Sequence, residues 1–255
     1  SGRGNDATLH GSGAAYAVGA SQEAGDAALS LPGGPANSAA AYATIPRGVI
    51  PHGTRDLTLS TWMRWDGGAA CQWPLSLGAN TSNYLFTSPD CGGVAAGIKA
   101  GYREDKSGAA ALPAGTWSQV TLVLTGGQKL ATYVDGRKVA EVTTRYDAAD
   151  LESAADRGGF LGKSPWAPDS YFAGDLDEVR LYGRALSDDE AQTLFDRGTL
   201  VVPSPEPTPT PTPTNEPSPS PEPSGSPSPE PSGSPSPEPS GSPSPEPSGS
   251  PSPEP

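Results

Sequence analysis

Short runs of alternating apolar and polar residues, separated by Gly, Pro, Asn or Asp, recur through the first 200 residues. Alternation with a period of two is typical of strands with one buried face, and frequent turn residues keep such strands short. In Val120–Leu124, for example, the even positions are apolar. The pattern predicts strands at Ala27–Leu31, Tyr42–Ile45, Leu57–Trp65, Trp73–Leu77, Tyr84–Ser88, Val94–Ile98, Ser118–Leu124, Lys129–Val134, Arg137–Thr143, Phe160–Leu161 and Phe172–Tyr182.

Local signals add one hairpin and one helix. Asp135-Gly136 between two apolar runs predicts a type I′ turn, because both central residues of that turn need a positive φ. Ser187 and Glu190 form a capping-box pattern, and Gly198 marks the end of the predicted helix. Many short strands, no strand–helix alternation and one short late helix predict an all-β sandwich.

The composition changes at Pro203. Beyond it there is no Lys, Arg or aromatic residue, and 22 of the chain's 31 prolines lie there. From Ser218 the sequence Ser-Pro-Ser-Pro-Glu-Pro-Ser-Gly repeats with a strict period of eight. Such a segment cannot bury enough apolar surface to offset the entropy of ordering. We therefore expect one folded domain at 1–202 and a disordered Pro/Ser/Glu-rich linker at 203–255.

Both ends suggest a piece of a longer protein, since the chain starts with Ser1 and ends inside a repeat. The net charge is −13, and seven of the 29 acidic residues lie in the repeats. The first 202 residues keep 22 acidic and 16 basic residues, a net charge of −6. This acidic balance argues against nucleic acid as a partner. No apolar run approaches the ~20 residues of a membrane helix, so membrane insertion is not expected.

Cys71 and Cys91 are the only cysteines. They could form a disulfide, hold a metal or remain as buried thiols. A metal site is disfavoured because there is no CxxC spacing and because His10 and His52 are far away in sequence. A disulfide is the favoured interpretation, and it implies an oxidising, extracellular compartment.

Several sequence blocks resemble a known family. Leu57–Arg64 (LTLSTWMR) resembles its "fTlstWvr" strand, and Trp117–Leu122 (WSQVTL) resembles "WxxVtlt". Gly174–Ser187 (GDLDEVRLYGRALS) is the most specific block, resembling "GxiDEvriYnrALs". In this order, the blocks resemble bacterial exported laminin-G-like (LamG-like) domains of the concanavalin A-like lectin/glucanase superfamily. The resemblance covers about residues 1–197 and implies a jelly roll of two antiparallel sheets in a secreted or cell-surface protein.

Because this superfamily includes glucanases, catalysis has to be considered. Glucanases carry E-x-D-x-x-E, or a close variant, on the catalytic strand, and their two acids flank the scissile bond. The dense strand cluster Asp175–Glu178 has no Glu at that spacing. The chain also lacks a Ser/His/Asp elbow, an HExxH motif and a phosphate loop. We therefore expect no catalytic residues in this module.

The resemblance also implies a structural calcium ion between the N-terminal segment and the Asp-Glu strand. Asp177 would supply a carboxylate, with Asn5 and the Gly2 carbonyl as partners. Such hard oxygen ligands suit Ca²⁺. The alternative is that Asp177 hydrogen-bonds the N-terminal loop without a metal.

Carbohydrate binding requires exposed aromatic rings beside polar groups. The turn-rich loop Lys163–Asp169 places the Trp166 indole at the surface, or packs it over the sandwich edge. Trp62 and Trp117 fall within strand motifs and are expected in the core. The candidate ligand contacts are Trp166, Tyr102, Tyr84 and Trp73.

The sequence therefore favours a non-catalytic carbohydrate-binding or accessory module of an exported multidomain bacterial protein, such as a glycoside hydrolase. The alternative is a structural spacer or protein-adhesion domain of a cell-surface protein.

Overall fold

A computed structural model of the chain describes residues 5–78, 80–151 and 158–197. The chain divides into two compact units, Ser1–Pro203 and Ser204–Pro255. The predicted linker lies outside the described residues, as does Gly2. The fold below is that of the first unit.

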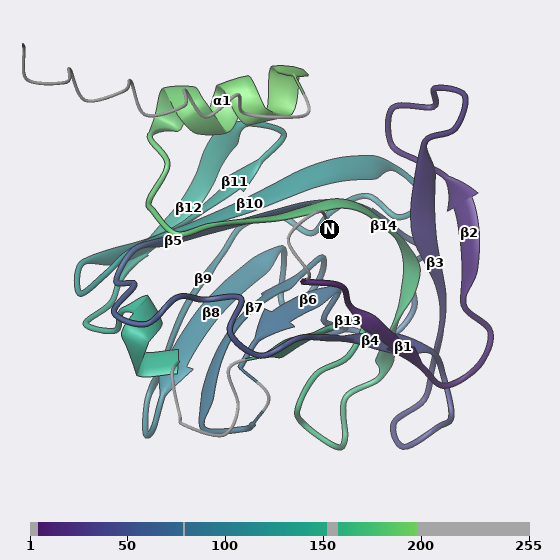
Figure 1. Cartoon of the computed structure of the whole chain (residues 1–255), viewed down its shortest axis with the longest axis horizontal. Coiled ribbons are helices and arrows are strands. Elements are labelled where there is room, and N and C mark those ends of the chain that lie inside the picture. Colours follow the sequence, from purple (N-terminus) through teal and green to yellow (C-terminus); the bar gives the residue numbers. More distant parts are fainter. Residues whose placement is uncertain (1–4, 79, 152–157, 198–255) are drawn as a thin grey trace, which may run out of the picture. The chain divides into compact units, whose positions relative to one another are not determined.

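Two seven-stranded antiparallel sheets face each other (Figure 1). Sheet 1 has the order β1 (Thr8–His10), β4 (Tyr42–Ile45), β13 (Gly159–Leu161), β6 (Leu75–Leu77), β7 (Asn83–Ser88), β8 (Ala95–Ala100), β9 (Glu104–Gly108). Sheet 2 has the order β12 (Arg137–Thr143), β11 (Lys129–Val134), β10 (Trp117–Thr125), β5 (Leu57–Trp65), β14 (Tyr171–Tyr182), β3 (Ala27–Gly34), β2 (Ala15–Val18). This is the predicted jelly-roll sandwich.

All strands predicted from the alternating pattern are present, with ends shifted by a few residues. That pattern missed β1, β2 and β9, which are edge strands. The sequence of β9, Glu-Asp-Lys-Ser-Gly, is polar throughout, so no hydrophobic alternation marks it. An edge strand buries less side-chain area than a central one, and its sequence signal is correspondingly weaker.

The core lies between the two sheets. In β5, Leu57, Leu59 and Met63 point inward and are almost fully buried. The expectation that Trp62 and Trp117 belong to this core was wrong. Both are half-buried on the outer face of sheet 2. In each strand the neighbouring residues point into the core, so the tryptophan between them points to the outside.

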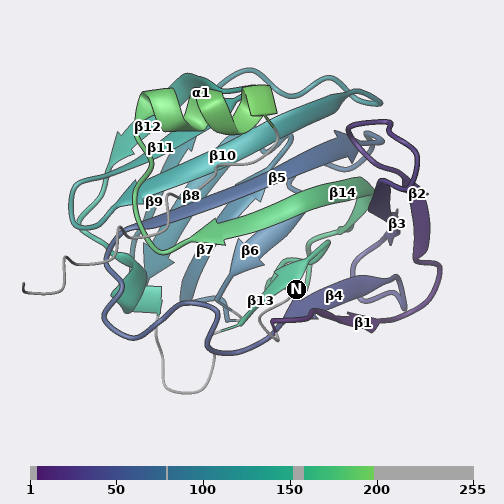
Figure 2. The same cartoon turned by 45° about the horizontal axis from the view of Figure 1, so that its top comes forward.

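The single α-helix of the described residues, α1 (Asp188–Arg197), begins as predicted. The Glu190 amide donates to Ser187 Oγ at 3.2 Å, and the Ser187 amide donates to Glu190 Oε2 at 2.9 Å. This capping box satisfies two amides that a helix start leaves free. The helix buries Leu194 against the outer face of sheet 2 (Figure 2). It therefore covers one outer face of the sandwich and not the other.

The β11–β12 hairpin also turns as predicted. Asp135 and Gly136 have φ values of 48° and 76°, the two positive values that a type I′ turn requires. Within residues 5–78, 80–151 and 158–197, one short 3₁₀ helix, η1 (Ala148–Leu151), completes the elements. Among the described residues, no helix has the length and apolar character needed to cross a membrane.

Candidate functional site

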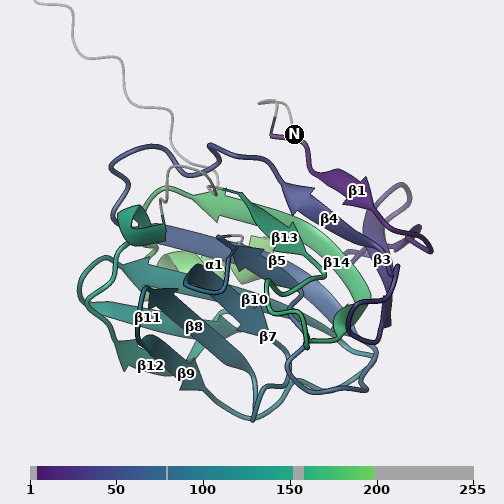
Figure 3. The same ribbon diagram turned by 90° about the horizontal axis from the view of Figure 1, so that it is seen from below.

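Figure 3 shows the molecule from below, with sheet 1 towards the viewer. The outer face of this sheet carries most of the candidate residues. In β7, Leu85 points into the core, while Tyr84 and Phe86 point outward and form a separate cluster with Trp73. The Trp73 and Phe86 rings are stacked with centroids 3.9 Å apart, and Trp73 lies 5.2 Å from Tyr84. Trp73 and Tyr84 are only 4% and 2% exposed, so both rings support this face rather than present a free surface.

Trp166 lies over this cluster. Its ring meets Tyr84 edge-on, with centroids 6.5 Å apart, and Lys99 Nζ lies 5.2 Å from the indole centroid. The loop is also tied locally, since the Trp166 amide donates to Ser164 Oγ at 3.0 Å. Trp166 remains 38% exposed. Both sequence alternatives are thus partly realised, because the indole packs on the sheet and still presents surface to solvent.

A cavity of about 150 Å³ adjoins Trp166. Its lining includes Asn37 and Asp169, which offer an amide and a carboxylate beside the indole. Lys163 and Tyr171 line its other part. A ring with hydrogen-bonding groups beside it is the combination expected for sugar binding.

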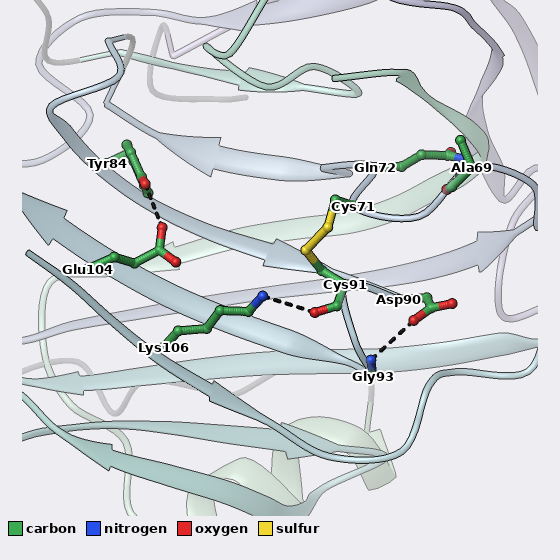
Figure 4. Close-up of a disulfide and its surroundings, with 9 residues drawn as sticks. All are labelled: Ala69, Cys71, Gln72, Tyr84, Asp90, Cys91, Gly93, Glu104 and Lys106. Carbon is green, nitrogen blue, oxygen red and sulfur yellow. Dashed lines mark hydrogen bonds between the residues drawn. A yellow bond between two sulfur atoms is a disulfide. The ribbon is translucent and has the colours of Figure 1, made fainter. Parts of the chain in front are cut away.

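Tyr84 is fixed by a carboxylate below this site. Its hydroxyl donates to Glu104 Oε2 at 2.5 Å (Figure 4). Burial, followed by this hydrogen bond, raises the pKa of the Tyr84 phenol far above its usual range. Tyr84 therefore stays a neutral donor, and its ring gives Trp166 a fixed support.

The predicted disulfide is present. Cys71 and Cys91, 20 residues apart in sequence, join the segment before β6 to the β7–β8 turn. Lys106 Nζ donates to the Cys91 carbonyl at 2.9 Å, so β9 is also connected to the bridge (Figure 4). Gln72, next to Cys71, accepts the Ala173 amide at 2.7 Å and links this segment to β14. These contacts hold the segment that carries Trp73.

A second aromatic cluster was not predicted from the sequence. His10 stacks on Tyr42 with ring centroids 5.0 Å apart, and Tyr42 lies 5.9 Å from Phe160 and 6.0 Å from Tyr171. Lys163 Nζ lies above this group. The weak signal for it was the alternation in β4, where Tyr42 and Thr44 occupy the phase opposite to core residues.

Tyr102 lies apart from these rings. It is 98% exposed in the β8–β9 turn and lines a different surface hollow with Arg103, Asp105 and Arg145. The structure therefore does not bring Tyr102 into the cavity beside Trp166.

Three carboxylates meet on the other sheet. Asp26, Asp177 and Glu178 each offer an oxygen within 4.8 Å of the others. Successive strand residues normally point to opposite faces, but β14 has a bulge between Asp177 and Arg180, and Glu178 has a φ of 50°. The irregularity brings two adjacent carboxylates together. Three hard oxygen donors fit a metal such as calcium in chemical type.

Asp177 does not meet its predicted metal partner Asn5 in the three-carboxylate cluster. Asp177 Oδ2 accepts the Ala20 amide at 2.8 Å, and its Oδ1 accepts the Glu178 amide at 2.8 Å. Asn5 instead lines a separate cavity of about 350 Å³ with apolar residues, among them Val179. Sequence reasoning missed Asp26, which lies in the β2–β3 turn and is distant from Asp177 in sequence.

The strand acids are already engaged. Asp175 is buried and accepts a hydrogen bond from Arg64 Nε at 2.8 Å. Asp177 receives two amide hydrogen bonds, as described above. Carboxylates held in ion pairs and hydrogen bonds fit a structural role, in keeping with a non-catalytic module.

Together, the two sheets and the late capped helix define a concanavalin A-like jelly-roll domain. The chain belongs to the concanavalin A-like lectin/glucanases superfamily, whose Laminin_G_3 family model matches residues 37–192. No curated protein sequence matched the chain.

Solved structures with a similar fold include sugar-binding and toxin domains. Domain 4 of AbnA, a GH43 extracellular arabinanase from Geobacillus stearothermophilus, was solved in complex with arabinotriose. It gives a TM-score of 0.60 at 18% identity over 74% of this chain and 87% of that one.

The binding domain of Paraclostridial Mosquitocidal Protein 1 gives a TM-score of 0.56 at 14% identity, over 75% of this chain and 48% of that one. The binding domain of botulinum neurotoxin serotype C1 gives a TM-score of 0.52 at 11% identity, over 76% of this chain and 48% of that one. The chain thus spans about half the length of the two toxin domains. At these identities the likeness establishes the fold alone.

Proposed function

We propose that the chain is a non-catalytic carbohydrate-binding module of an exported multidomain protein, and that its ligand stacks on Trp166. The observation that carries the proposal is the half-exposed indole fixed on Tyr84, beside a cavity lined by Asn37 and Asp169. The arabinotriose complex of AbnA domain 4, which shares the fold, supports the same ligand class.

The physical basis is the match between a flat ring and the apolar face of a sugar. Stacking removes apolar surface of both partners from water, and hydroxyls around the sugar ring then need hydrogen-bond partners. Asn37 offers both donors and acceptors, while Asp169 is an acceptor when ionised. The indole is already packed on Tyr84, so little side-chain entropy is lost on binding.

The setting we propose is extracellular. A disulfide is the kind of bond that persists in oxidising compartments, and Cys71–Cys91 supports this location. The repeats at 203–255 would act as an extended linker to a further domain, such as a glycoside hydrolase. Attachment to a polysaccharide raises the local concentration of substrate around such a partner.

We also propose that Asp26, Asp177 and Glu178 hold a structural Ca²⁺. All three offer carboxylate oxygens within 4.8 Å of one another. The ion would connect the β2–β3 turn to β14 and neutralise part of the acidic charge there.

A glycan microarray and pull-down on insoluble polysaccharides, using the whole 255-residue chain, test the proposal. Binding is expected to fall strongly in Trp166→Ala and to persist in Tyr16→Ala. Tyr16 is a matched exposed aromatic, 84% accessible on β2 of the other sheet. Retention on no glycan, with calcium and with a chelator, would refute the proposal and favour a spacer or protein-adhesion domain.

A further inference from the structure

Lysines on the two sheets differ in their partners. Lys129 and Lys138, on sheet 2, both form ion pairs with Glu141. The other three of the chain's five lysines lie on the outer face of sheet 1: Lys99, Lys106 and Lys163. None of these three has a carboxylate partner within the described ranges 5–78, 80–151 and 158–197. The ammonium groups of these three lysines therefore form no ion pair among the described residues.

Lys163 is held in an unusual way. Its Nζ lies 4.4 Å from the centroid of Tyr42, 5.4 Å from Phe160 and 5.8 Å from Tyr171. Three ring faces attract and position the ammonium, but they leave its strong N–H donors without oxygen acceptors. Lys99 and Lys106 differ, because each donates to a main-chain carbonyl. Within the described part of the chain, the Lys163 ammonium has no oxygen partner.

The position of Lys163 connects it to the Trp166 site. Both residues line the same cavity of about 150 Å³. Tyr84 beneath Trp166 lies on β7, whereas the rings around Lys163 include Phe160 on β13 and Tyr42 on β4, two and three strand positions away in sheet 1. Spacings of about 4.8 Å between strands place the two groups of rings roughly 10–14 Å apart. An oligosaccharide, rather than a single sugar, would contact both groups.

We infer that the ligand is an acidic oligosaccharide, with one sugar ring stacked on Trp166 and the carboxylate of a nearby unit bound by Lys163. The inference rests on the proposed function and specifies its ligand class. A carboxylate supplies a charge-assisted acceptor for the fixed ammonium, which is stronger than a neutral sugar hydroxyl. The surrounding rings exclude part of the water that would otherwise screen the pair.

Of the carboxylates described at this site, neither Asp169 nor Glu104 forms an ion pair with Lys163. Asp169 lines the same cavity, and its amide donates to the Trp166 carbonyl at 3.1 Å, so its residue is tied to the Trp166 end. Glu104 accepts the Tyr84 hydroxyl. Asp169 can therefore accept hydroxyl hydrogen bonds from the stacked sugar, while Lys163 stays available for the acid group.

The experiment compares acidic oligosaccharides with their methyl esters, which keep the sugar skeleton and remove the charge. Oligogalacturonates, oligomannuronates and glucuronoxylan fragments, each with its ester, are titrated into the full chain by calorimetry. We expect at least one acid form to bind about tenfold or more tightly than its ester. Lys163→Met should abolish this difference between acid and ester, and Lys163→Arg should retain it.

Lys129→Met, which removes a lysine from the other sheet, is the matched control and should keep the preference. Thermal melts establish that each variant is folded. Equal affinity for acid and ester, or an unchanged preference in Lys163→Met, would overturn the inference while neutral glycan binding through Trp166 still stood. If no glycan of any kind bound the chain, the proposed function would fail and the inference with it.

Discussion

Removing the Cys71–Cys91 bridge should destabilise the domain by an amount set by the loop it closes. The cysteines are 20 residues apart, and the loop between them contains β6 and β7. In the chain-entropy model a loop of this size contributes about 3 kcal/mol, because the bridge restricts the unfolded chain. In a domain of this size, 1 kcal/mol shifts Tm by about 2–4 °C. The double variant Cys71→Ser/Cys91→Ser should therefore melt about 6–12 °C lower.

The assay is a thermal melt followed by circular dichroism, with urea unfolding to obtain the free energy directly. Wild-type protein melted in reducing agent is the control, and its Tm should equal that of the double variant. Well below its Tm, the variant should still bind glycan, because pairing of β7 with β6 and β8 keeps Tyr84 in place beneath Trp166 without the bridge. A fall in Tm of less than about 2 °C would show that loop closure in the unfolded chain does not stabilise this domain.

Two further predictions concern acidic side chains. The Arg184 hydrogen bonds and the Ser187 amide lower the pKa of Glu190 to about 2, so its stabilisation is present above the ordinary value of 4.5 and is lost as pH falls towards 2. Glu190→Gln should lower Tm at pH 7, and the difference from wild type should vanish near pH 2; a constant difference would contradict this linkage. Calcium chloride should raise Tm of the wild type, since a ligand that binds only the folded state stabilises it, and Asp177→Asn should lose this shift. An equal calcium shift in both proteins would place any bound calcium elsewhere.

The sequence predicted the fold well because its strongest signals are local. Alternation in β5 and β10 reflects a core on one side, and Ser187 with Glu190 is a complete helix-start signal within four residues. Alternation assigns a residue to a face but does not say what covers that face. This is why Trp62 and Trp117 were misplaced: their rings lie outside the sandwich, and Trp62 stacks on Phe195 of α1.

The site was less predictable because it depends on pairing between distant strands. The second aromatic cluster forms only because β13 pairs with β4 in a register that sets Phe160 opposite Thr44. The acid cluster likewise needs the β2–β3 turn to reach the bulge of β14. No local pattern encodes either register. Trp166 was accessible to sequence reasoning because its exposure follows from the turn-rich loop that carries it.

The helix on sheet 2 has a practical consequence for measuring binding. The helix α1 packs on the outer face of sheet 2 (Figure 1). Its last described residue, Arg197, lines a hollow with Trp62 and Asp177 of that sheet, whereas Trp166 packs on Tyr84 of sheet 1. Coupling through amines would instead attach the outer face of sheet 1 to the sensor, since three of the five lysines lie on that face. A sensor surface that captures the chain through its C-terminal side should therefore leave that face open, whereas amine coupling should partly block it.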